Sequence, residues 1–206
     1  MQKKALIVDL DGTLYYQRPV QICIGLELLI YYLFHFWRIK ELKQILIYRH
    51  QHNTQTNFDI RTFCKQQKTD IKTIQSLVQK WLFLKPLKWI KIFADKNLIY
   101  YLKEKQKSIP VVIYSDYETK EKLNALNFKP NFKFSYDGTN IRYLKPNPQG
   151  LTYIANNLNL LPENILIIGD RFDKDGLAAS AFGSEFLILP QNPIARRKIT
   201  KKLKHL

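Results

Sequence analysis

Cysteine is scarce in this sequence, and its scarcity excludes two kinds of small cross-linked protein. Of 206 residues only two are cysteines, Cys23 and Cys64, which lie far apart and form no C-x-x-C pair. A disulfide framework and a zinc site both need more cysteines at closer spacing. A reducing cytoplasm is therefore the simplest location for the chain.

Acidic residues are also few. The sequence has 17 Asp and Glu against 33 Lys and Arg, which gives a formal net charge of +16. Such a charge attracts polyanions through a long-range field, so a nucleic acid or an anionic membrane surface is a conceivable partner. A lysine-rich background composition that only keeps the chain soluble gives the same excess. Charge alone does not choose between these interpretations.

Long uninterrupted apolar runs are absent. The first run, Ala5 to Val8, ends at Asp9 and is too short for the apolar core of a signal peptide. The longest apolar stretch, Val20 to Trp37, lies at the short limit of the roughly 17 to 25 residues that cross a bilayer. Polar residues interrupt it at Gln21, Glu27 and His35. We predict a buried helix that faces the core domain and neighbouring helices, with contact to a membrane surface as the alternative.

Four short apolar runs, each bounded by polar or turn residues, are typical of strands that are covered on both faces. They are Ala5 to Val8, Val111 to Tyr114, Ile165 to Ile168 and Phe186 to Leu189. Helical patterns lie between them, in a segment that Asp95 would cap, at Glu118 to Leu126 and at Gly150 to Leu158. Strands that alternate with helices predict an α/β fold with a doubly wound parallel sheet.

The segment from about Tyr15 to Pro86 breaks this alternation. It lacks convincing strands and has apolar residues at helical spacing, with the polar passage His50 to Asn57 as a predicted loop. We therefore expect an α/β core formed by residues 1–14 and 87–206, and a smaller helical insert over residues 15–86. No Pro- or Gly-rich linker marks the two boundaries.

The sharpest chemical signal is the run Asp9-Leu10-Asp11-Gly12-Thr13, directly after the first predicted strand. In a parallel sheet, ligands bind in the crevice at the carboxyl ends of the strands. Two carboxylates there can divide the work, because one can attack a substrate while the other handles protons. The alternative is an acidic turn that only follows a buried strand.

Two further signals point to a functional site only when they are combined with the other motifs. Ser115 follows the second predicted strand and could hold a phosphoryl oxygen, although a serine there is usually a cap or turn residue. Lys145 precedes Pro146, and the proline would hold its loop in a defined direction. A positioned ammonium offsets phosphate charge. Alone, it would be an ordinary surface lysine.

A fourth signal follows the strand Ile165 to Ile168, where the chain reads Gly169-Asp170-Arg171-Phe172-Asp173-Lys174-Asp175-Gly176. Three carboxylates at a strand end suit a hard cation, which takes oxygen ligands. A charged surface loop is the alternative.

These four elements, in this order and each at a strand end, resemble the haloacid dehalogenase superfamily. The resemblance implies Asp9 as nucleophile, Asp11 as general acid and base, Ser115 and Lys145 as phosphate clamp, and a Mg²⁺ ion held by Asp9, Asp11, Asp170 and Asp175. Asp173 also lies near the place of the second acid of the last motif, but the motif spacing favours Asp175. The insert occupies the position of the helical cap found in many members.

The resemblance implies a magnesium-dependent phosphatase that forms an aspartyl-phosphate on Asp9 and acts on a small phosphorylated metabolite. Three alternatives stay open: a phosphotransferase or mutase, a phosphatase of nucleic-acid or lipid-linked phosphate, and a non-catalytic binding protein. Asp11 argues against dehalogenation, which in this superfamily proceeds without that second acid.

A basic C-terminal segment follows Pro193, with Arg196, Arg197, Lys198, Lys201, Lys202 and Lys204. We expect it to be solvated and to lie outside the catalytic set, with an anion-attracting element as the alternative.

Overall fold

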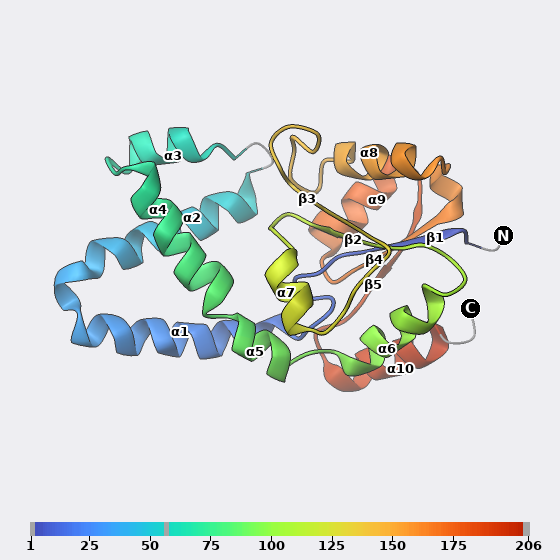
Figure 1. Ribbon diagram of the computed structural model, residues 1–206, viewed down its shortest axis with the longest axis horizontal. Coiled ribbons are helices and arrows are strands. Elements are labelled where there is room, and N and C mark those ends of the chain that lie inside the picture. Colours follow the sequence, from blue (N-terminus) through green and yellow to red (C-terminus); the bar gives the residue numbers. More distant parts are fainter. Residues whose placement is uncertain (1–2, 56–57, 204–206) are drawn as a thin grey trace.

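The strand β1 (Ala5–Val8) occupies the centre of a parallel sheet (Figure 1). The computed structural model describes residues 3–55 and 58–203, and its sheet has the strand order β3-β2-β1-β4-β5. The other strands are β2 (Val111–Ser115), β3 (Phe132–Ser135), β4 (Ile165–Gly169) and β5 (Glu185–Ile188). This topology confirms the predicted α/β fold.

Register places the ends of the three central strands at one edge of the sheet. Val8 lies opposite Ile113 of β2 and Ile168 of β4, and all three strands run parallel. The residues that follow these strands therefore share one crevice.

Both faces of the sheet are buried, as the continuous apolar strands predict. Leu6 and Val8 pack into one core cluster, while Ala5 and Ile7 pack into a second cluster on the opposite face. The helices of this α/β part are α6 (Lys96–Lys105), α7 (Lys120–Ala125), α8 (Gln149–Leu158), α9 (Leu177–Phe182) and α10 (Pro193–Leu203). Asp95 caps α6, because its side chain accepts the backbone N–H of Leu98 at 3.0 Å.

The edge strand β3 has no counterpart among the four predicted strands. Its sequence, Phe132-Lys133-Phe134-Ser135, alternates apolar and polar residues, and Phe132 and Lys133 are exposed. A search for fully buried apolar runs misses such a half-covered edge strand.

The segment between β1 and α6 is helical, as predicted. It contains α1 (Gln17–Phe34), the 3₁₀ turn η1 (Phe36–Arg38), α2 (Ile39–Thr54), α3 (Ile60–Gln66), α4 (Ile71–Val78), the π-helical turn η2 (Gln79–Leu84) and α5 (Leu87–Ile92). Figure 1 shows α1 to α4 together on one side of the sheet. Their own core contains Tyr32, Ile45, Phe63, Ile74 and Trp81.

The chain leaves the sheet at Tyr15 and returns at Ala94, which form an isolated antiparallel bridge. The division at residues 15 and 86 remains a prediction.

The prediction that Val20 to Trp37 is a buried helix is wrong for one side of α1. Val20, Ile24 and Tyr32 are buried, but many other apolar side chains of this stretch are exposed. A helix that is apolar all round has more apolar surface than its neighbours cover. The buried side of α1 packs on the core of the sheet through Val20 and Ile24 and on the insert core through Tyr32. Within the described residues no single helix has the length and hydropathy to cross a bilayer, whereas α1 and the η1–α2 segment pass that test only as a pair bent by 114°.

The predicted loop at His50 to Asn57 is also wrong for most of its length, because α2 continues to Thr54. His52 stabilises this last turn by stacking on Tyr117, with ring centroids 4.1 Å apart. Asn57 lies outside the described residues.

Candidate active site

Lys145 lies at the centre of the crevice, between two carboxylates. Its ammonium Nζ is 2.6 Å from Asp9 Oδ1 and 2.7 Å from Asp175 Oδ1, and all three side chains are buried. Asp9 comes from the end of β1, Asp175 from the turn after β4, and Lys145 from the loop before α8. Residues far apart in the sequence thus meet at one sheet edge.

Asp9 also accepts a hydrogen bond from Thr13 Oγ1 at 2.9 Å. Burial, followed by the nearby carboxylates of Asp175 and Asp170, raises the pKa of Asp9 well above its usual value, although Lys145 opposes the shift. Burial and Asp175 likewise raise the pKa of Asp170 to about 6. In both groups the ionised form lacks sufficient compensating positive charge.

Carboxylates outnumber ammonium groups in this crevice. The carboxylates are Asp9, Asp11, Asp116, Asp170 and Asp175, and the ammonium groups are Lys122, Lys145 and Lys174. Arg171 also lines the crevice, but its charge is balanced by Asp173. One oxygen from each of Asp9, Asp170 and Asp175 can be chosen so that all three lie within 4.8 Å of one another. An excess of two negative charges beside three converging oxygens fits a hard divalent cation such as Mg²⁺.

The structure places Asp175 in the site and Asp173 outside it. The side chain of Asp175 is 3% exposed, and it accepts the backbone N–H of Arg171 at 3.1 Å. Asp173 pairs with the guanidinium of Arg171, and its side chain is 64% exposed. The turn after β4 therefore points one acid inward and the other toward solvent.

Asp11 has partners that the sequence does not reveal. Both of its carboxylate oxygens accept from Lys122 Nζ, at 2.6 and 2.8 Å, and Tyr15 donates its O–H to Oδ1. Ser115 Oγ lies 3.3 Å from Oδ2. Burial opposes the shift, but Lys122, Tyr15 and Ser115 together lower the pKa of Asp11. Asp11 is therefore held in its ionised form.

A second pair that sequence reasoning missed supports the Lys145 loop. Asp116 accepts the backbone N–H of Lys145 at 3.0 Å and Lys174 Nζ at 3.0 Å, and both side chains of the pair are buried. Asp116 directly follows Ser115 at the end of β2, so its position at a strand end was a usable signal. Lys122 had no such signal, because only the tertiary fold brings it to Asp11.

We call residues 9–14 the catalytic loop. Gly12 allows this loop to pass close to Asp170. Its φ is +91°, and a Cβ there would lie 2.2 Å from Asp170 Oδ2. Any other residue would strain the backbone and displace a carboxylate of the site.

The prediction that the basic C-terminal segment is solvated and remote is wrong for Arg196. This side chain is 0% exposed, and its guanidinium donates to the carbonyl oxygens of Gly12 at 2.7 Å and Thr13 at 3.2 Å. Arg197, Lys198 and Lys201 lie on the exposed side of α10, and Lys204 lies outside the described residues. Because a helix has two sides, one basic segment contains both a buried clamp and a solvated surface.

We predict that Arg196→Met reduces turnover roughly 10-fold or more and lowers the melting temperature, because it removes the side-chain donor of the Thr13 carbonyl and leaves the Gly12 carbonyl with only Gln191 Nε2 at 3.2 Å. The exposed Arg197→Met is the matched control and should behave like the wild type. Turnover, melting temperature and the magnesium concentration for half-activation would be measured for both. Equal behaviour of the two variants would contradict the clamp.

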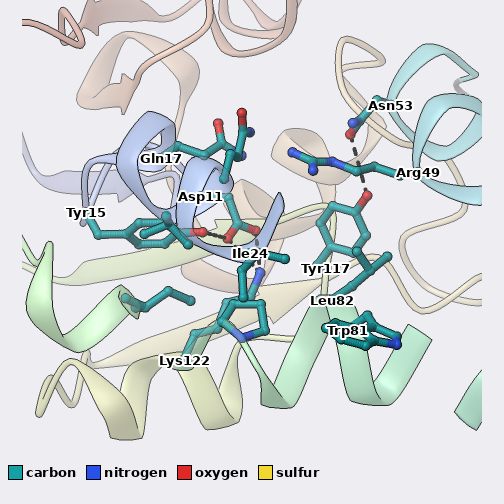
Figure 2. Close-up of a pocket in the computed structure, with 14 residues that line it drawn as sticks. Asp11, Tyr15, Gln17, Ile24, Arg49, Asn53, Trp81, Leu82, Tyr117 and Lys122 are labelled. Carbon is teal, nitrogen blue, oxygen red and sulfur yellow. Dashed lines mark hydrogen bonds and ion pairs between the residues drawn. The ribbon is translucent and has the colours of Figure 1, made fainter. Parts of the chain in front are cut away.

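A second pocket adjoins Asp11 on the side of the helical insert (Figure 2). It is lined by Asp11, Tyr15, Gln17, Val20, Gln21, Ile24, Arg49, Asn53, Trp81, Leu82, Pro86, Ile90, Tyr117 and Lys122. Tyr117 O–H contacts Asn53 Oδ1 at 3.5 Å across its edge. Among the residues that the structure describes, no carboxylate lies within ion-pair distance of Arg49. This pocket therefore offers an apolar wall and one guanidinium without a counter-ion.

The profile of the haloacid dehalogenase-like hydrolases matches residues 3–183. The chain belongs to this family. The match confirms the resemblance seen in the motifs and establishes a hydrolase. No curated protein matched the chain.

Solved structures share the fold at low sequence identity. The first is a 2-haloacid dehalogenase from Pseudomonas syringae pv. Tomato, 15% identical, with a TM-score of 0.58 over 92% of this chain and 86% of that chain. The second is a predicted phosphoglycolate phosphatase from Haemophilus somnus, 19% identical, with a TM-score of 0.57 over 92% and 86%. YfnB from Bacillus subtilis, bound to magnesium, is 15% identical, with a TM-score of 0.55 over 92% and 87%. The names of these similar structures thus include a dehalogenase and a predicted phosphatase.

Proposed function

We propose that this hydrolase is a magnesium-dependent phosphatase that transfers the phosphoryl group of a monoester to Asp9. The excess of two negative charges around Asp9, Asp170 and Asp175, beside Lys145, carries the proposal. An anionic substrate cannot approach such a crevice until a cation balances it. A site built to displace halide from carbon has no need of this carboxylate cluster.

Asp9, Asp170 and Asp175 would hold the metal, which supplies charge neutralisation for the phosphoryl oxygens. Asp11, which the sequence also suggested as a ligand, lies outside this group of three, and both of its oxygens accept from Lys122. An Asp9 oxygen then bonds to phosphorus as the ester P–O bond breaks, and the leaving oxygen takes a proton from Asp11. Water subsequently attacks the phosphorus of the aspartyl-phosphate and gives a proton to Asp11. The bond between Asp9 and phosphorus breaks, which releases inorganic phosphate and restores the Asp9 carboxylate. Lys145 and Ser115 orient the phosphoryl oxygens throughout.

To act as a general acid, Asp11 must be protonated. The unliganded site disfavours its protonated form, because Lys122 lowers the pKa of this carboxyl. A bound phosphoryl group places like charge beside Asp11 and so raises its pKa. Substrate binding therefore moves the group in the direction that leaving-group protonation requires.

A screen of phosphate monoesters and 2-haloacids, with and without Mg²⁺, tests the proposal. Metal-dependent release of inorganic phosphate supports it, whereas release of halide, with inert esters, would assign a dehalogenase. Appearance of the phosphate on a second sugar hydroxyl, instead of in water, would assign the phosphotransferase alternative.

Magnesium should stabilise the protein more at neutral than at acidic pH. The pKa of Asp170 in the folded protein is about 6, above the ordinary value of 3.8. Protonation of Asp170 therefore stabilises the metal-free folded state relative to the unfolded state, and this stabilisation is lost as the pH rises through 6. Below that pH the proton competes with the metal. The rise in melting temperature on adding Mg²⁺ should thus grow between about pH 5 and pH 7.5. A rise independent of pH would contradict this assignment of ligands.

The leaving group of the ester would occupy the pocket beside Asp11, where Arg49 faces an apolar wall. We predict that Arg49→Gln raises KM roughly 10-fold for a small ester with a second anionic group and leaves kcat nearly unchanged, since it removes a charged hydrogen bond. Arg61→Gln, at an exposed position of α3, is the control. Unchanged KM values for all esters would remove Arg49 from substrate binding.

A further inference from the structure

The outer side of α1 carries an apolar stripe that no other element within residues 3–55 and 58–203 covers. Ile22, Leu26, Leu29 and Leu33 recur at helical spacing, and each is more than half exposed. Residues spaced in this way lie on one face of a helix. The opposite side of α1 supplies Val20, Ile24 and Tyr32 to the protein interior.

The stripe continues around the bend from α1 to α2, at the end of the insert remote from the sheet (Figure 1). Phe34 and Trp37 are 74% and 67% exposed, and Phe36 and Ile39 are also exposed. We call residues 22–39 the apolar elbow. Soluble monomers rarely expose so many contiguous large apolar side chains unless the patch has a binding role.

Positive charge surrounds the elbow without matching negative charge. Arg18, Lys40 and Lys43 are exposed beside it. Residues 17–54 contain only two acids, Glu27 and Glu41. Glu27 already pairs with Lys88 at 2.8 Å and Glu41 with Arg38 at 2.8 Å. The surface that surrounds the apolar side chains is therefore cationic.

We propose that the apolar elbow binds the surface of an anionic membrane. Its aromatic and aliphatic side chains would enter the boundary between headgroups and acyl chains, where tryptophan is favoured. The flanking lysines and arginine would lie among lipid phosphates. The bend of 114° between the two helices suits a segment that lies in the interface, and no single described helix is long and apolar enough to span the bilayer.

Charge favours a membrane over a second copy of the chain. Two elbows in contact would bring Lys40 and Lys43 of each copy together, while Glu27 and Glu41 are already paired within each copy. Like charges across an interface oppose association. This proposal does not depend on the catalytic assignment, because no residue of the elbow lies in the carboxylate crevice.

The first test is co-sedimentation of the full chain with vesicles of phosphatidylcholine, alone or mixed with phosphatidylglycerol. Binding should require the anionic lipid and should weaken as salt shortens the screening length from about 10 Å at 0.1 M. Trp37 provides a local probe, because it is 67% exposed, whereas Trp81 is 1% exposed and the half-buried Trp89 donates its ring N–H to Glu27 at 2.6 Å. A blue shift of the emission on binding should disappear in Trp37→Phe.

The second test compares matched double variants. Leu33→Ser with Phe36→Ser should reduce vesicle binding at least 10-fold. Leu161→Ser with Ile194→Ser, at exposed apolar positions of the core domain, should leave it unchanged. Lys40→Glu with Lys43→Glu keeps the apolar side chains and should weaken binding to anionic vesicles only, so the test survives if the serine variant fails to fold.

Failure of the wild-type chain to bind anionic vesicles would overturn the proposal, as would equal binding by the elbow and control variants. Light scattering tests whether a second copy of the chain, and not a membrane, covers the apolar elbow. A concentration-dependent dimer that only the elbow variant abolishes, without vesicle binding, would assign the surface to a second copy.

Discussion

Asp9→Asn is expected to lose phosphate release by roughly 10⁴-fold or more, the scale on which removal of a nucleophile acts. The amide has nearly the same shape as the carboxylate but is not an anionic nucleophile. Lys145 keeps Asp175 as a partner at 2.7 Å, so no ammonium is left unpaired. Phosphate release and thermal melting would be measured on the same preparation.

Stability should be equal to that of the wild type or slightly higher. Burial raises the pKa of Asp9, which means that the fold disfavours its charge, and asparagine removes that charge. A folded variant that releases phosphate at the wild-type rate would remove Asp9 from the mechanism. Unfolding would instead show that the carboxylate is required structurally.

Asp170→Ala is expected to weaken activation by magnesium strongly, whereas Asp173→Ala should keep it. Asp170 belongs to the three converging carboxylates, and Asp173 pairs with Arg171 at the surface. Loss of one ligand from a small oxygen site should raise the magnesium concentration for half-activation by about 10-fold to 100-fold. Chelation followed by a magnesium titration would measure this shift.

The two variants form a control pair, because both remove a carboxylate from the same turn. Only one of them changes the crevice. A larger loss in Asp173→Ala than in Asp170→Ala would show that the turn after β4 presents its acids in another way. Full activity of the wild type in a chelator would contradict the metal requirement itself.

Local sequence was sufficient to predict the centre of the site. Asp9, Ser115 and Asp170 each directly follow or end an apolar strand, and parallel strands of matched register bring their carboxyl ends to one edge. The turn after β4 was the one local ambiguity. Spacing favoured Asp175, and the structure places that side chain beside Lys145 at 2.7 Å.

The residues around this centre were not predictable in the same way. Lys122 contacts Asp11 across 111 positions of sequence, and nothing in its neighbourhood distinguishes it from other lysines. Arg196 lies in a basic segment whose composition indicates a solvent-exposed helix. Only the packing of α10 shows which side is buried, because sequence periodicity does not say which neighbour covers a helix.

The same limit explains the error at α1. Apolar density correctly predicted a helix but suggested that it is covered all round, since burial is the usual fate of large apolar side chains. Leu29 and Leu33 are as apolar as Ile24, yet they are 56% and 66% exposed, whereas Ile24 packs into the core cluster of the sheet. The difference in burial between the two sides of α1 depends on how many neighbouring elements the short insert can place against this helix.

The contact between Arg196 and the catalytic loop also affects the order of folding. The guanidinium reaches the carbonyl of Gly12 across 184 positions of sequence. A ribosome therefore makes Gly12 long before the arginine that holds its loop. Contacts between such distant residues form late, because a large loop must close first. The catalytic loop of this hydrolase should consequently be among the last parts of the chain to become ordered.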